Sequence, residues 1–582
     1  MKNLIILHNP ESGQWLRFVN PVKVFVANSI EEVIPCLKNI EELVYNDRMY
    51  VAGFVSYEAS PAFDEALSTK QPDTFPLLWF GIYSQPEISE KVSLSNSSAY
   101  SFGEFKPSVS KEEYEKNIER IKELIAAGDT YQVNYTYRLN TAFHGDSQAL
   151  FRNLVAAQQE GYAAYIDTGR YVICSASPEL FFRIENNKLV SRPMKGTAAR
   201  GKTLAEDKLL ADWLYNSEKN RAENIMIVDM IRNDMGRIAD IGSVKVTRFF
   251  DIERYPTLFQ MTSTVESTTN ATISELFTAL FPCASITGAP KPRTMEIISE
   301  IETTPRRIYT GSIGYFAPDS SAQFNVAIRT VLIDTETGIA EYGFGGGIVW
   351  DSDSIDEFEE CQVKSRILTH DVSDFSLLET ILWTPGDGYF LLDYHLRRLT
   401  DSAEYFGYNA DMERINEQLA TTAQSLSETA KPQKIRLLVA RDGNIVCESI
   451  PLDEPENTET VRIRLSSEPV DSHNVFLYHK TTNREVYNNA KASCNECDDV
   501  LLFNERGEIT ESCIANIILK LNGELVTPPV ECGLLAGTYR GWLIDNGEVK
   551  EKIISIDDLK NAKEIYLANS VRKLRKAVVI NE

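Results

Sequence analysis

The sequence predicts an α+β protein built from two or more globular domains. The chain has 582 residues and 43% apolar content, which is more than one hydrophobic core accommodates. Short apolar runs separated by Gly, Pro, Ser and Asn indicate strands and turns, and amphipathic segments with capping residues indicate helices. Together these observations favour a mixed fold over an all-helical or all-strand one.

Charge and composition exclude several classes of protein. A formal net charge of −25 argues against a nucleic-acid or anionic-membrane surface, and VRKLRK near the C-terminus is the one basic run. The first apolar run is too short for a signal peptide, and no stretch of about 18 apolar residues spans a membrane, so we expect a cytoplasmic protein. The nine cysteines, including Cys494 and Cys497 in a CxxC, lack a framework spacing and are expected to be reduced thiols.

The first part of the chain, residues 1–108, is expected to contain strands and turns without catalytic groups. A helix is predicted from Ser110, where Ser-Lys-Glu-Glu forms a capping box and apolar residues recur at helical spacing until Gly128. The next segment, GDTYQVNYTYRL, alternates as a strand. Isolated histidines such as His8 and His144 lack an orienting carboxylate or cysteine and are interpreted as structural or solvated.

Lys195 is the candidate around which the first half is organised. It lies in SRPMKGTAARG between Pro193 and Gly196, which predicts a sharply defined turn that aims one amine. A lysine becomes nucleophilic when burial or a nearby cation favours its neutral form, and Arg192 and Arg200 are close in sequence. Taken alone, such a lysine is more often a solvated loop residue, so the flanking segments decide the interpretation.

Carboxylates on both sides of this lysine supply candidate acids and metal ligands. Glu179 follows a Ser-Pro turn before an apolar strand, where desolvation would favour its neutral, proton-donating form; the alternative is a solvated turn carboxylate. Glu223 precedes an apolar helix face, and IDEFEECQVKSRIL places Glu357, Glu360 and Lys364 on one helical face. Two such helices would offer carboxylate oxygens to Mg²⁺, unless both are ordinary solvated faces.

Two glycine-marked segments lie between these acidic clusters. CASITGAPKPRTMEIISEIE reads as a loop that leads into a helix, so the Thr287 hydroxyl and the first helical amides could hold an anion. In YGFGGGIVW, the triplet Gly345, Gly346 and Gly347 would let backbone amides approach a carboxylate. Arg329, at the end of a strand, could bind the same carboxylate through two hydrogen bonds. A glycine triplet alone is a weak signal.

The first half of the sequence resembles the chorismate-utilising enzymes. The resemblance is carried by motifs in this order: SPE, PMKGT, AENIMIVDMIRND, SITGAPKPRTMEII, YTGSIGYF and GGGIV followed by EFEECQVK. That family includes component I of anthranilate synthase and of aminodeoxychorismate synthase, isochorismate synthase and salicylate synthase. The resemblance covers about residues 1–370. It implies an anthranilate-synthase-like, two-lobed β-sandwich with flanking helices, in which residues 1–108 form a β-rich region and residues 109–370 the chorismate-binding core.

The same resemblance implies roles for individual residues. Glu223 and Glu360, with Glu357 nearby, would hold the Mg²⁺ that binds the ring carboxylate of chorismate. The implied substrate-binding positions are Thr287, Tyr309, Arg329, Gly345, Gly346, Gly347 and Lys364. Gln260 stands where many relatives carry histidine. Because an amide cannot move a proton near neutral pH, Gln260 is given a positioning role.

Lys195 decides the position within the family. Anthranilate synthases carry alanine in the middle of this motif, whereas aminodeoxychorismate synthases carry lysine. For the latter, the resemblance implies that the amine adds at ring C2 while the C4 hydroxyl leaves, with Glu179 as general acid; ammonia then enters at C4 and expels the lysine. Covalent catalysis of this kind divides one difficult displacement into two easier ones. A non-catalytic sensor on this fold would be expected to lack Lys195 or the carboxylates, and all are present.

A second domain is expected over residues 375–582. THDVSDFS is a polar break, and LLETILWTPGDGYFLLDYHLRRL then predicts a hairpin and an amphipathic helix. Later segments are LYHKTTNREVYNNA, LLFNERGEITESCIANIILK, LLAGTYRGWL and EIYLANSVR. As a set they resemble the fold-type IV pyridoxal-phosphate enzymes, which include branched-chain and D-amino-acid aminotransferases and aminodeoxychorismate lyase.

This second resemblance implies pyridoxal 5'-phosphate as a cofactor. Lys480 would form the Schiff base, and Glu511 would pair with the protonated pyridine nitrogen. The positions that match phosphate-binding or flanking residues are Arg398, Gly537, Thr538, Asn569 and Ser570. Family members have a longer N-terminal subdomain before the HLRRL helix. This chain lacks the first strands of that subdomain, which leaves open how the mouth of the active site and a dimer contact are formed.

Together the two resemblances imply synthesis of 4-aminobenzoate. The first half would convert chorismate into 4-amino-4-deoxychorismate, and the second would eliminate pyruvate from it. No cysteine has the glycine neighbours of a glutaminase nucleophile, so ammonia is expected from a separate glutamine amidotransferase subunit. A homodimer through the second domain is a further expectation. Two alternatives stay open: an amino-acid aminotransferase in the C-terminal half, or an anthranilate-synthase-type enzyme in the N-terminal half.

Overall fold

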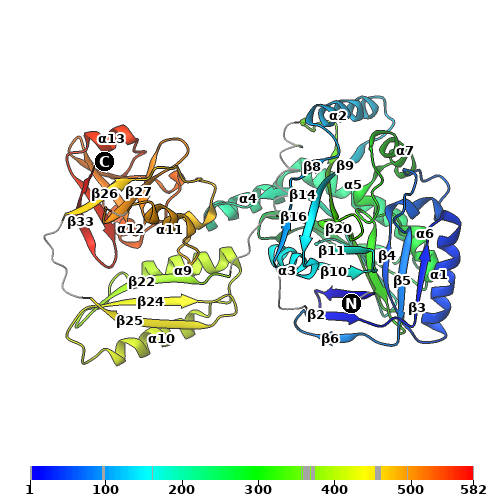
Figure 1. Cartoon of the computed structure of the whole chain (residues 1–582), viewed down its shortest axis with the longest axis horizontal. Helices are drawn as coiled ribbons and strands as arrows, with labels where there is room; N and C mark the ends of the chain where they lie inside the picture. The colour runs from blue at the N-terminus through cyan, green and yellow to red at the C-terminus, as the bar shows by residue number, and fades with distance from the viewer. Residues whose placement is uncertain are drawn as a thin grey trace. The chain divides into compact units, whose positions relative to one another are not determined.

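The structure is a computed structural model that describes residues 3–92, 94, 99–159, 161–354, 357, 368, 374–452, 460–494 and 496–580. The chain forms two compact units. One comprises Met1–Ala199 and Ala211–Val372, and the other comprises Arg200–Leu210 and Ser373–Glu582. Each unit has its own sheets and hydrophobic cores, whose elements are labelled in Figure 1.

Two large antiparallel sheets form the first unit. Within the described residues, the first sheet has 11 strands, and its main path runs through β17 (Gly288–Ala289), β9 (Gln132–Gly145), β21 (Ile339–Ile348), β20 (Thr330–Asp334), β11 (Tyr171–Ser177), β10 (Tyr162–Asp167), β1 (Leu4–Asn9), β2 (Gln14–Phe18) and β6 (Glu87–Ser89). Strands β7 (Tyr100–Phe102) and β8 (Lys106–Pro107) also pair with β9.

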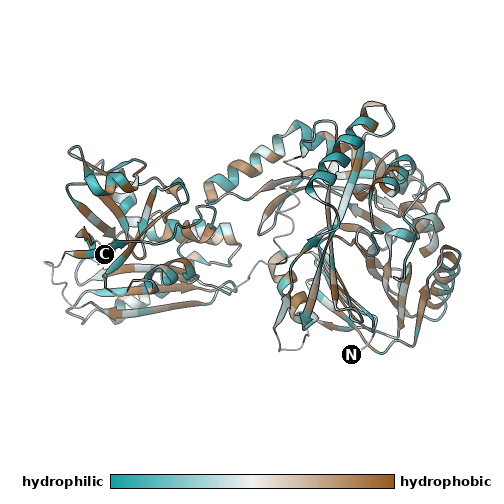
Figure 2. Ribbon diagram, turned by 45° about the horizontal axis from the view of Figure 1, so that its top comes forward, coloured by the Kyte–Doolittle hydropathy of each residue, from teal (hydrophilic) through white to brown (hydrophobic). Residues whose placement is uncertain are grey.

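The second sheet has 10 strands in the part of the chain that the structure describes. Its main path runs through β14 (Met194–Ala199), β16 (Leu258–Thr268), β13 (Lys188–Arg192), β12 (Leu180–Glu185), β19 (Ala322–Val326), β18 (Ser312–Phe316), β4 (Tyr50–Val55), β5 (Leu78–Tyr83) and β3 (Lys23–Ala27). Strand β15 (Lys245–Arg254) pairs with β16. Teal and brown alternate along many of these ribbons in Figure 2, as expected for elements with one buried face.

Three cores give this unit its layers. In one core the two sheets pack face to face, with Phe18 and Ile173 from the first sheet and Phe54 from the second. The other two cores pack each sheet against its own helices. The second sheet packs on α1 (Ile30–Tyr45), α5 (Glu218–Gly236) and α6 (Ile273–Leu280), and the first on α2 (Lys111–Ala126), α3 (Ser147–Gln158) and α7 (Lys291–Ile301). The predicted β-sandwich with flanking helices is therefore confirmed.

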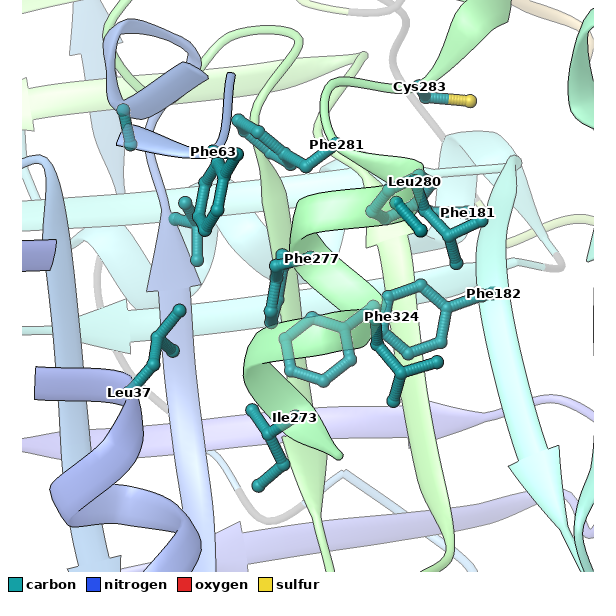
Figure 3. Packing of buried hydrophobic residues seen from close by; sticks show 14 of the residues in the cluster. Leu37, Phe63, Phe181, Phe182, Ile273, Phe277, Leu280, Phe281, Cys283 and Phe324 are labelled. Atoms are coloured by element: carbon teal, nitrogen blue, oxygen red, sulfur yellow. The ribbon is translucent and has the colours of Figure 1, made fainter. Parts of the chain in front are cut away.

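An aromatic cluster fixes helix α6 on the second sheet. Phe277 of α6 lies with its ring centroid 5.9 Å from that of Phe182 and 5.3 Å from that of Phe324, both in an edge-to-face arrangement. Phe63 and Phe281 close the cluster on the other side (Figure 3). Such pairs add about 0.5–1.5 kcal/mol each beyond the burial of their area.

Helix α2 begins where the sequence predicts. The Ser110 hydroxyl accepts a hydrogen bond from the Glu113 N–H at 3.2 Å, which satisfies one of the free amides of the first turn. Helix α1, by contrast, lies in a region expected to hold only strands and turns, so that expectation was wrong. Its N-cap, Ser29, forms a capping box with Glu32, a sequence signal that indicates a helix start although Pro35 lies inside the helix.

The second unit contains a small and a larger sheet. The small sheet has four strands in the order β23 (Gly388–Tyr389), β22 (Leu377–Thr384), β24 (Gln433–Val439) and β25 (Ile445–Pro451), and it packs on α9 (Leu392–Phe406) and α10 (Met412–Ser425). The larger, mixed sheet has eight described strands in the order β28 (Ile509–Ser512), β27 (Asp499–Phe503), β26 (Val461–Leu465), β33 (Lys573–Val579), β32 (Ile565–Asn569), β29 (Asn516–Leu521), β30 (Glu524–Thr527) and β31 (Lys550–Glu551). Helices α11 (Glu485–Ala492), α12 (Thr538–Asp545) and α13 (Ile556–Asn561) complete the unit.

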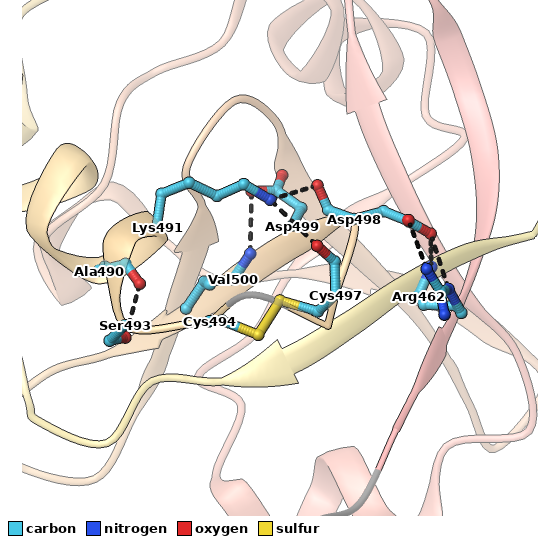
Figure 4. Close-up of a disulfide and its surroundings, with 9 residues drawn as sticks. All are labelled: Arg462, Ala490, Lys491, Ser493, Cys494, Cys497, Asp498, Asp499 and Val500. Atoms are coloured by element: carbon cyan, nitrogen blue, oxygen red, sulfur yellow. Dashed lines mark hydrogen bonds and ion pairs between the residues drawn. A yellow bond between two sulfur atoms is a disulfide. The ribbon is translucent and has the colours of Figure 1, made fainter.

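One pair of cysteines differs from the sequence prediction. Cys494 and Cys497 are joined by a disulfide, so the expectation that all cysteines are reduced was wrong for this pair (Figure 4). The Lys491 ammonium donates to the Cys497 carbonyl at 3.3 Å and to the Asp498 carbonyl at 2.6 Å, which fixes the same short loop. The other described cysteines are free: Cys36, Cys174, Cys283, Cys447, Cys513 and Cys532. In the described parts of the chain, every helix is too short or too polar to span a lipid bilayer.

Candidate active sites

Lys195 lies on a bulge of strand β14 rather than on the predicted turn. Met194 pairs with Thr262 of β16, and the next pair joins Thr197 to Gln260, so β14 contains one extra residue between these pairs. Gly196 adopts φ +98°, a conformation that favours glycine. A bulge of this kind re-aims side chains and is frequent beside active sites. The PMKGT motif thus directs Lys195 by a shift in strand register.

The Lys195 side chain lines a cavity of about 200 Å³. Most of the residues singled out in the first half of the sequence line the same cavity, namely Glu179, Lys195, Glu223, Gln260, Tyr309, Arg329, Gly345, Gly346, Gly347 and Glu357. Thr287 is not among the lining residues. It is buried beside them, and its hydroxyl donates to the Ala284 carbonyl at 3.2 Å. Glu360 and Lys364 lie outside the described residues.

Three polar side chains hold the backbone of the Lys195 bulge. The Asn224 amide donates to the Lys195 carbonyl at 3.3 Å, and the Ser263 hydroxyl donates to the Asn224 Oδ1 at 2.6 Å. On the other side, the Gln260 Nε2 donates to the Gly196 carbonyl at 2.9 Å. Gln260 therefore contacts the strand that carries the lysine, which suits a positioning role.

Glu179 is a buried carboxyl group between strands β11 and β12. Its residue is 3% exposed, and its Oε1 has no hydrogen-bond partner among the described residues. Burial raises the pKa of Glu179 to about 7, although a hydrogen bond with Ser285 and the nearby charge of Lys195 oppose the rise. Near neutral pH this group is therefore partly protonated, and it can donate a proton into the cavity.

The raised pKa of Glu179 gives the first prediction. The protonated, acid form is populated below pH 7 and is lost as pH rises through about 7, so kcat/KM for the chorismate reaction should fall above that pH. Glu179→Gln should lower kcat/KM on the order of 10²–10⁴-fold and remove this descending limb. The control is Glu185→Gln, at the exposed end of strand β12, which begins directly after Glu179. An unchanged descending limb in Glu179→Gln would assign the titration to another group.

Two carboxylates of the predicted metal site line the same cavity. Glu223 comes from helix α5, and Glu357 is held by the Ser352 hydroxyl, which donates to its Oε1 at 2.7 Å. Magnesium in proteins is commonly bound by one or two carboxylates, with substrate and water completing its shell. Among the described residues no group of three or more His, Cys, Asp or Glu side chains is arranged to hold a metal. Glu223 and Glu357 supply the type of oxygen ligand that Mg²⁺ prefers, and the magnesium site itself stays a prediction.

The glycine triplet makes room for two of these groups. All three glycines lie in strand β21, paired with β9. A Cβ on Gly346 would lie 2.9 Å from the Glu357 Oε2, and a Cβ on Gly347 would lie 2.7 Å from the Lys195 Nζ and 2.1 Å from the Gln132 Nε2. Strand β21 thus has no side chains at the positions that the Lys195 amine and the Glu357 carboxylate approach.

Gly347→Ala is therefore expected to displace Lys195 while leaving the fold intact. A shift of about 1 Å in a reacting group costs on the order of 10²-fold in rate, and we expect a loss of that size in kcat/KM for chorismate. The matched control is Gly236→Ala at the end of helix α5, where an added Cβ meets no atom within 4 Å. Steady-state kinetics and thermal melting of both variants check this. Equal activity of both variants would contradict the close approach.

Arg329 is half-buried in the wall of the cavity with its backbone at φ +50°. Its Nη1 donates to the Gln158 side chain, and its guanidinium lies 5.5 Å from the Tyr255 ring centroid. Among the described residues it has no carboxylate partner within ion-pair distance, and burial lowers its pKa. A guanidinium in that position suits a ligand carboxylate.

The two arginines near Lys195 in sequence have other partners. Arg192 lies 3.4 Å from a Glu253 carboxylate oxygen, and Arg200 lies 2.7 Å from an Asp207 oxygen in the second compact unit. Both positive charges are thus neutralised by carboxylates. The effect of these two charges on Lys195, which is half-buried, stays a prediction.

The second unit contains a cavity of about 440 Å³. It is lined by every residue for which the sequence predicted contact with pyridoxal phosphate, namely Arg398, Lys480, Glu511, Gly537, Thr538, Asn569 and Ser570. Gly537 is the N-cap of helix α12, and a Cβ there would lie 1.9 Å from the Asn516 Oδ1, so the backbone is left open beside the cavity. The start of a helix beside an open backbone suits a phosphate group.

Lys480 has the properties of a reactive amine. Burial and the neighbouring Arg398 lower its pKa to about 8, against the opposing charges of Glu379 and Glu511. Its neutral fraction near pH 7 is therefore larger than that of an ordinary lysine. The Lys480 carbonyl accepts from the Leu378 N–H at 2.9 Å, which ties this segment to the start of strand β22.

Glu511 is held in place from three directions. Its Oε1 accepts from the Tyr487 hydroxyl at 2.8 Å and from the Leu535 N–H at 3.0 Å, and its Oε2 accepts from the Asn516 amide at 3.1 Å. Burial raises its pKa to about 7. A buried carboxylate gains most from a cationic partner, which suits a role opposite a protonated ring nitrogen. The residues present therefore fit pyridoxal phosphate.

A buried network behind Arg398 was missed in the sequence. The Arg398 guanidinium donates to both carboxylate oxygens of Glu379, at 2.9 and 2.7 Å, and the Glu379 Oε2 lies 2.6 Å from the His395 Nδ1. The other ring nitrogen of His395 lies 3.3 Å from the Thr538 hydroxyl. Burial alone would raise the pKa of Glu379, but Arg398 and His395 lower it to about 2. The sequence signal for this network is the single glutamate, Glu379, in the apolar run LLETILW, because a buried carboxylate needs a cationic partner.

Comparison with known proteins agrees with this division of the chain. A family model described as chorismate binding enzyme matches residues 2–370, so the chain belongs to that family. A second model, amino-transferase class IV, matches residues 376–580 and implies pyridoxal phosphate as the cofactor of that part.

The curated relatives match less than half of the chain. An aminodeoxychorismate synthase of Streptomyces griseus is 41% identical over 258 residues, which are 44% of this chain and 35% of that protein. Aminodeoxychorismate synthase component 1 of Bacillus subtilis (strain 168) is 39% identical over 260 residues, 44% of this chain and 55% of that protein. The chain thus spans less than two thirds of the length of these relatives. The solved anthranilate synthase component I of Streptococcus pneumoniae TIGR4 shares the fold, with a TM-score of 0.54, 24% identity and coverage of 64% of this chain and 93% of that one.

Proposed function

We propose that this chain converts chorismate into 4-aminobenzoate in two reactions, one in each cavity. The observation that carries the proposal is the position of Lys195, whose amine lines one cavity with the protonatable carboxyl of Glu179. The 41% and 39% identities to aminodeoxychorismate synthases support the same choice of reaction.

In the first reaction, the neutral Lys195 amine forms a bond to ring C2 of chorismate. The ring double bonds shift, the C4–O bond breaks, and Glu179 supplies the proton with which the hydroxyl leaves as water. Ammonia then forms the new C4–N bond, and the C2–Nζ bond breaks to release Lys195. The net change is chorismate plus ammonia to 4-amino-4-deoxychorismate plus water. Arg329 and Tyr309, on the wall of the cavity, would bind the substrate's carboxylates.

Magnesium is proposed as the metal of this site. Glu223 and Glu357 would hold it, with Glu360 as a further ligand from the segment outside the described residues. The ion would supply positive charge for the ring carboxylate of chorismate. Ammonia is proposed to come from a separate glutamine amidotransferase subunit, in line with the name "component 1" of the Bacillus subtilis relative.

In the second reaction, the C-terminal cavity would remove pyruvate from 4-amino-4-deoxychorismate. Bound pyridoxal phosphate supplies an electron sink for the substrate's amino group. Lys480 would hold the cofactor and move protons, Glu511 would keep the ring nitrogen charged, and the network of Arg398, Glu379 and His395 would fix the phosphate end. A homodimer through this unit remains part of the proposal.

The charge of the second cavity supports a lyase over an amino-acid aminotransferase. Among its described lining residues Glu511 is the only carboxylate, whereas six are basic: Arg398, Lys434, Arg436, Lys480, Arg484 and Arg572. The cofactor's phosphate accounts for part of this charge. A substrate with two carboxylates, such as 4-amino-4-deoxychorismate, matches the remaining positive charge better than an amino acid with one carboxylate.

The test is product identification from the full-length protein. Purified protein is incubated with chorismate, ammonium and Mg²⁺, with and without added pyridoxal phosphate, and the products are separated by mass spectrometry. We expect 4-aminobenzoate and pyruvate with the cofactor and 4-amino-4-deoxychorismate without it. Accumulation of anthranilate would refute the first assignment. A keto acid paired with a new amino acid, formed without pyruvate, would refute the second.

A further inference from the structure

The second compact unit includes a segment from the middle of the chain. Residues 200–210 pack with residues 373–582, although the strand that precedes them, β14, belongs to the first unit and carries Lys195. Helix α4 (Leu204–Asn216) starts within this segment. Sequence spacing alone does not predict this contact, because the partners of the segment are about 200 residues further along the chain.

Arg200 is the best-anchored residue of the segment. Its side chain is 7% exposed and lies 2.7 Å from an oxygen of Asp207, whose side chain is 3% exposed. Its Nη2 also donates to the Tyr405 carbonyl at 2.9 Å, and the guanidinium lies 4.4 Å from the centroid of the Tyr405 ring. A buried ion pair with these additional hydrogen bonds is costly to break from one side, because the remaining charge is left without a partner.

The next residue, Gly201, completes the contact. Its carbonyl accepts from the Tyr405 hydroxyl at 2.7 Å, and its N–H donates to the Asp207 Oδ1 at 2.9 Å. A Cβ at this position would lie 2.3 Å from the Asp207 backbone nitrogen, so a larger residue does not fit. The exposed pair of Lys208 and Glu404, 2.8 Å apart, extends the contact along helix α9.

The segment reaches the neighbour of the reactive lysine of this unit. The His479 Nε2 lies 3.1 Å from the Lys202 carbonyl, and its Nδ1 lies 2.9 Å from the Ser402 hydroxyl. Burial lowers the pKa of His479 to about 4, so its ring is neutral at pH 7. Because a carbonyl only accepts, Nε2 carries the proton and Nδ1 accepts from the hydroxyl. Both ring nitrogens of His479 thus have hydrogen-bond partners, and helix α9 and the segment together fix the orientation of the ring.

We propose that residues 200–210 are a positioning element of the pyridoxal-phosphate site, which holds His479 and thereby sets the position of Lys480. His479 and Lys480 share a peptide bond, so a displacement of the His479 backbone shifts the Cα atom from which the Lys480 side chain projects. The ring of His479 also packs on Tyr405, with centroids 4.4 Å apart, so the same tyrosine contacts the segment and the histidine. This inference rests on the proposed use of pyridoxal phosphate by this unit.

The test compares full-length variants by their binding of pyridoxal phosphate. Arg200→Met removes the buried ion pair and should weaken cofactor binding by about tenfold or more, and Arg200→Lys should restore part of it. Tyr405→Phe removes only the hydroxyl that binds the Gly201 carbonyl and should weaken binding about threefold to tenfold. The dissociation constant and the pH midpoint of the bound cofactor's absorbance are measured for each. The pH midpoint reports the surroundings of Lys480 and would not move in a merely less stable protein.

The control is Tyr408→Phe, which removes a tyrosine hydroxyl that donates to the Phe375 carbonyl at 2.5 Å in the same unit, without contact to the segment. It should bind the cofactor within about twofold of wild type. The inference is overturned if Tyr405→Phe matches Tyr408→Phe in affinity and in pH midpoint, whether or not Arg200→Met folds. Failure of the wild-type protein to bind pyridoxal phosphate would instead refute the proposed function of the unit. Conversion of chorismate should be unchanged in Tyr405→Phe, which separates this effect from general damage.

Discussion

Lys195→Ala is expected to lower formation of 4-amino-4-deoxychorismate by on the order of 10³-fold or more. The variant removes the amine that lines the cavity beside Glu179, and direct attack of ammonia would have to replace two easier steps by one difficult displacement. The fold should persist, because the bulge of β14 is held through backbone groups by Asn224 and Gln260 rather than through the lysine. Single-turnover product analysis by mass spectrometry, together with thermal melting, checks both statements.

The matched control for that variant is Lys188→Ala. Lys188 lies on strand β13 of the same sheet and forms an ion pair with Glu266 at 2.9 Å, outside the cavity. It should retain wild-type rates within about twofold, since surface ion pairs contribute about 0–1 kcal/mol. If Lys195→Ala formed the amino-chorismate as fast as Lys188→Ala, the covalent role of the lysine would be disproved. A mass shift on Lys195 in rapidly quenched wild-type protein would support it.

Lys480→Ala is expected to stop the sequence at 4-amino-4-deoxychorismate. The variant lacks the buried amine with a pKa of about 8, so the second cavity can neither hold the cofactor covalently nor move protons with this group. Formation of 4-aminobenzoate should fall on the order of 10³-fold or more, while the consumption of chorismate continues. The absorbance of covalently bound pyridoxal phosphate should be lost as well.

Lys520→Ala provides the comparison in the same unit. Lys520 is paired with Glu564 at 3.0 Å on the surface, and its loss should leave both reactions unchanged. Production of 4-aminobenzoate by Lys480→Ala at the Lys520→Ala rate would mean that the second cavity does not carry out the elimination.

Local sequence signals predicted much of the fold, and the two family resemblances predicted the residues that line both cavities. The cap at Ser110 predicted helix α2, and the order of motifs led to two cavities lined by the expected residues. The features that the sequence did not predict share one cause. The bulge at Lys195 depends on how β14 pairs with β16, which are about 60 residues apart, and sequence spacing carries no information on register. Glu379 and His479 owe their roles to partners brought close only by tertiary packing.

The extra residue in β14 has a consequence for how this chain can change. The deletion of Gly196 would cancel the offset between the two pairs and remove the bulge that aims Lys195. Amino-acid substitutions in this strand can change the rate of the first reaction in small steps. The loss of this one codon would instead abolish the reaction in one step, while the other residue pairs between β14 and β16 re-form. The chemistry of the first unit is therefore encoded as much in the number of residues in this strand as in their identity.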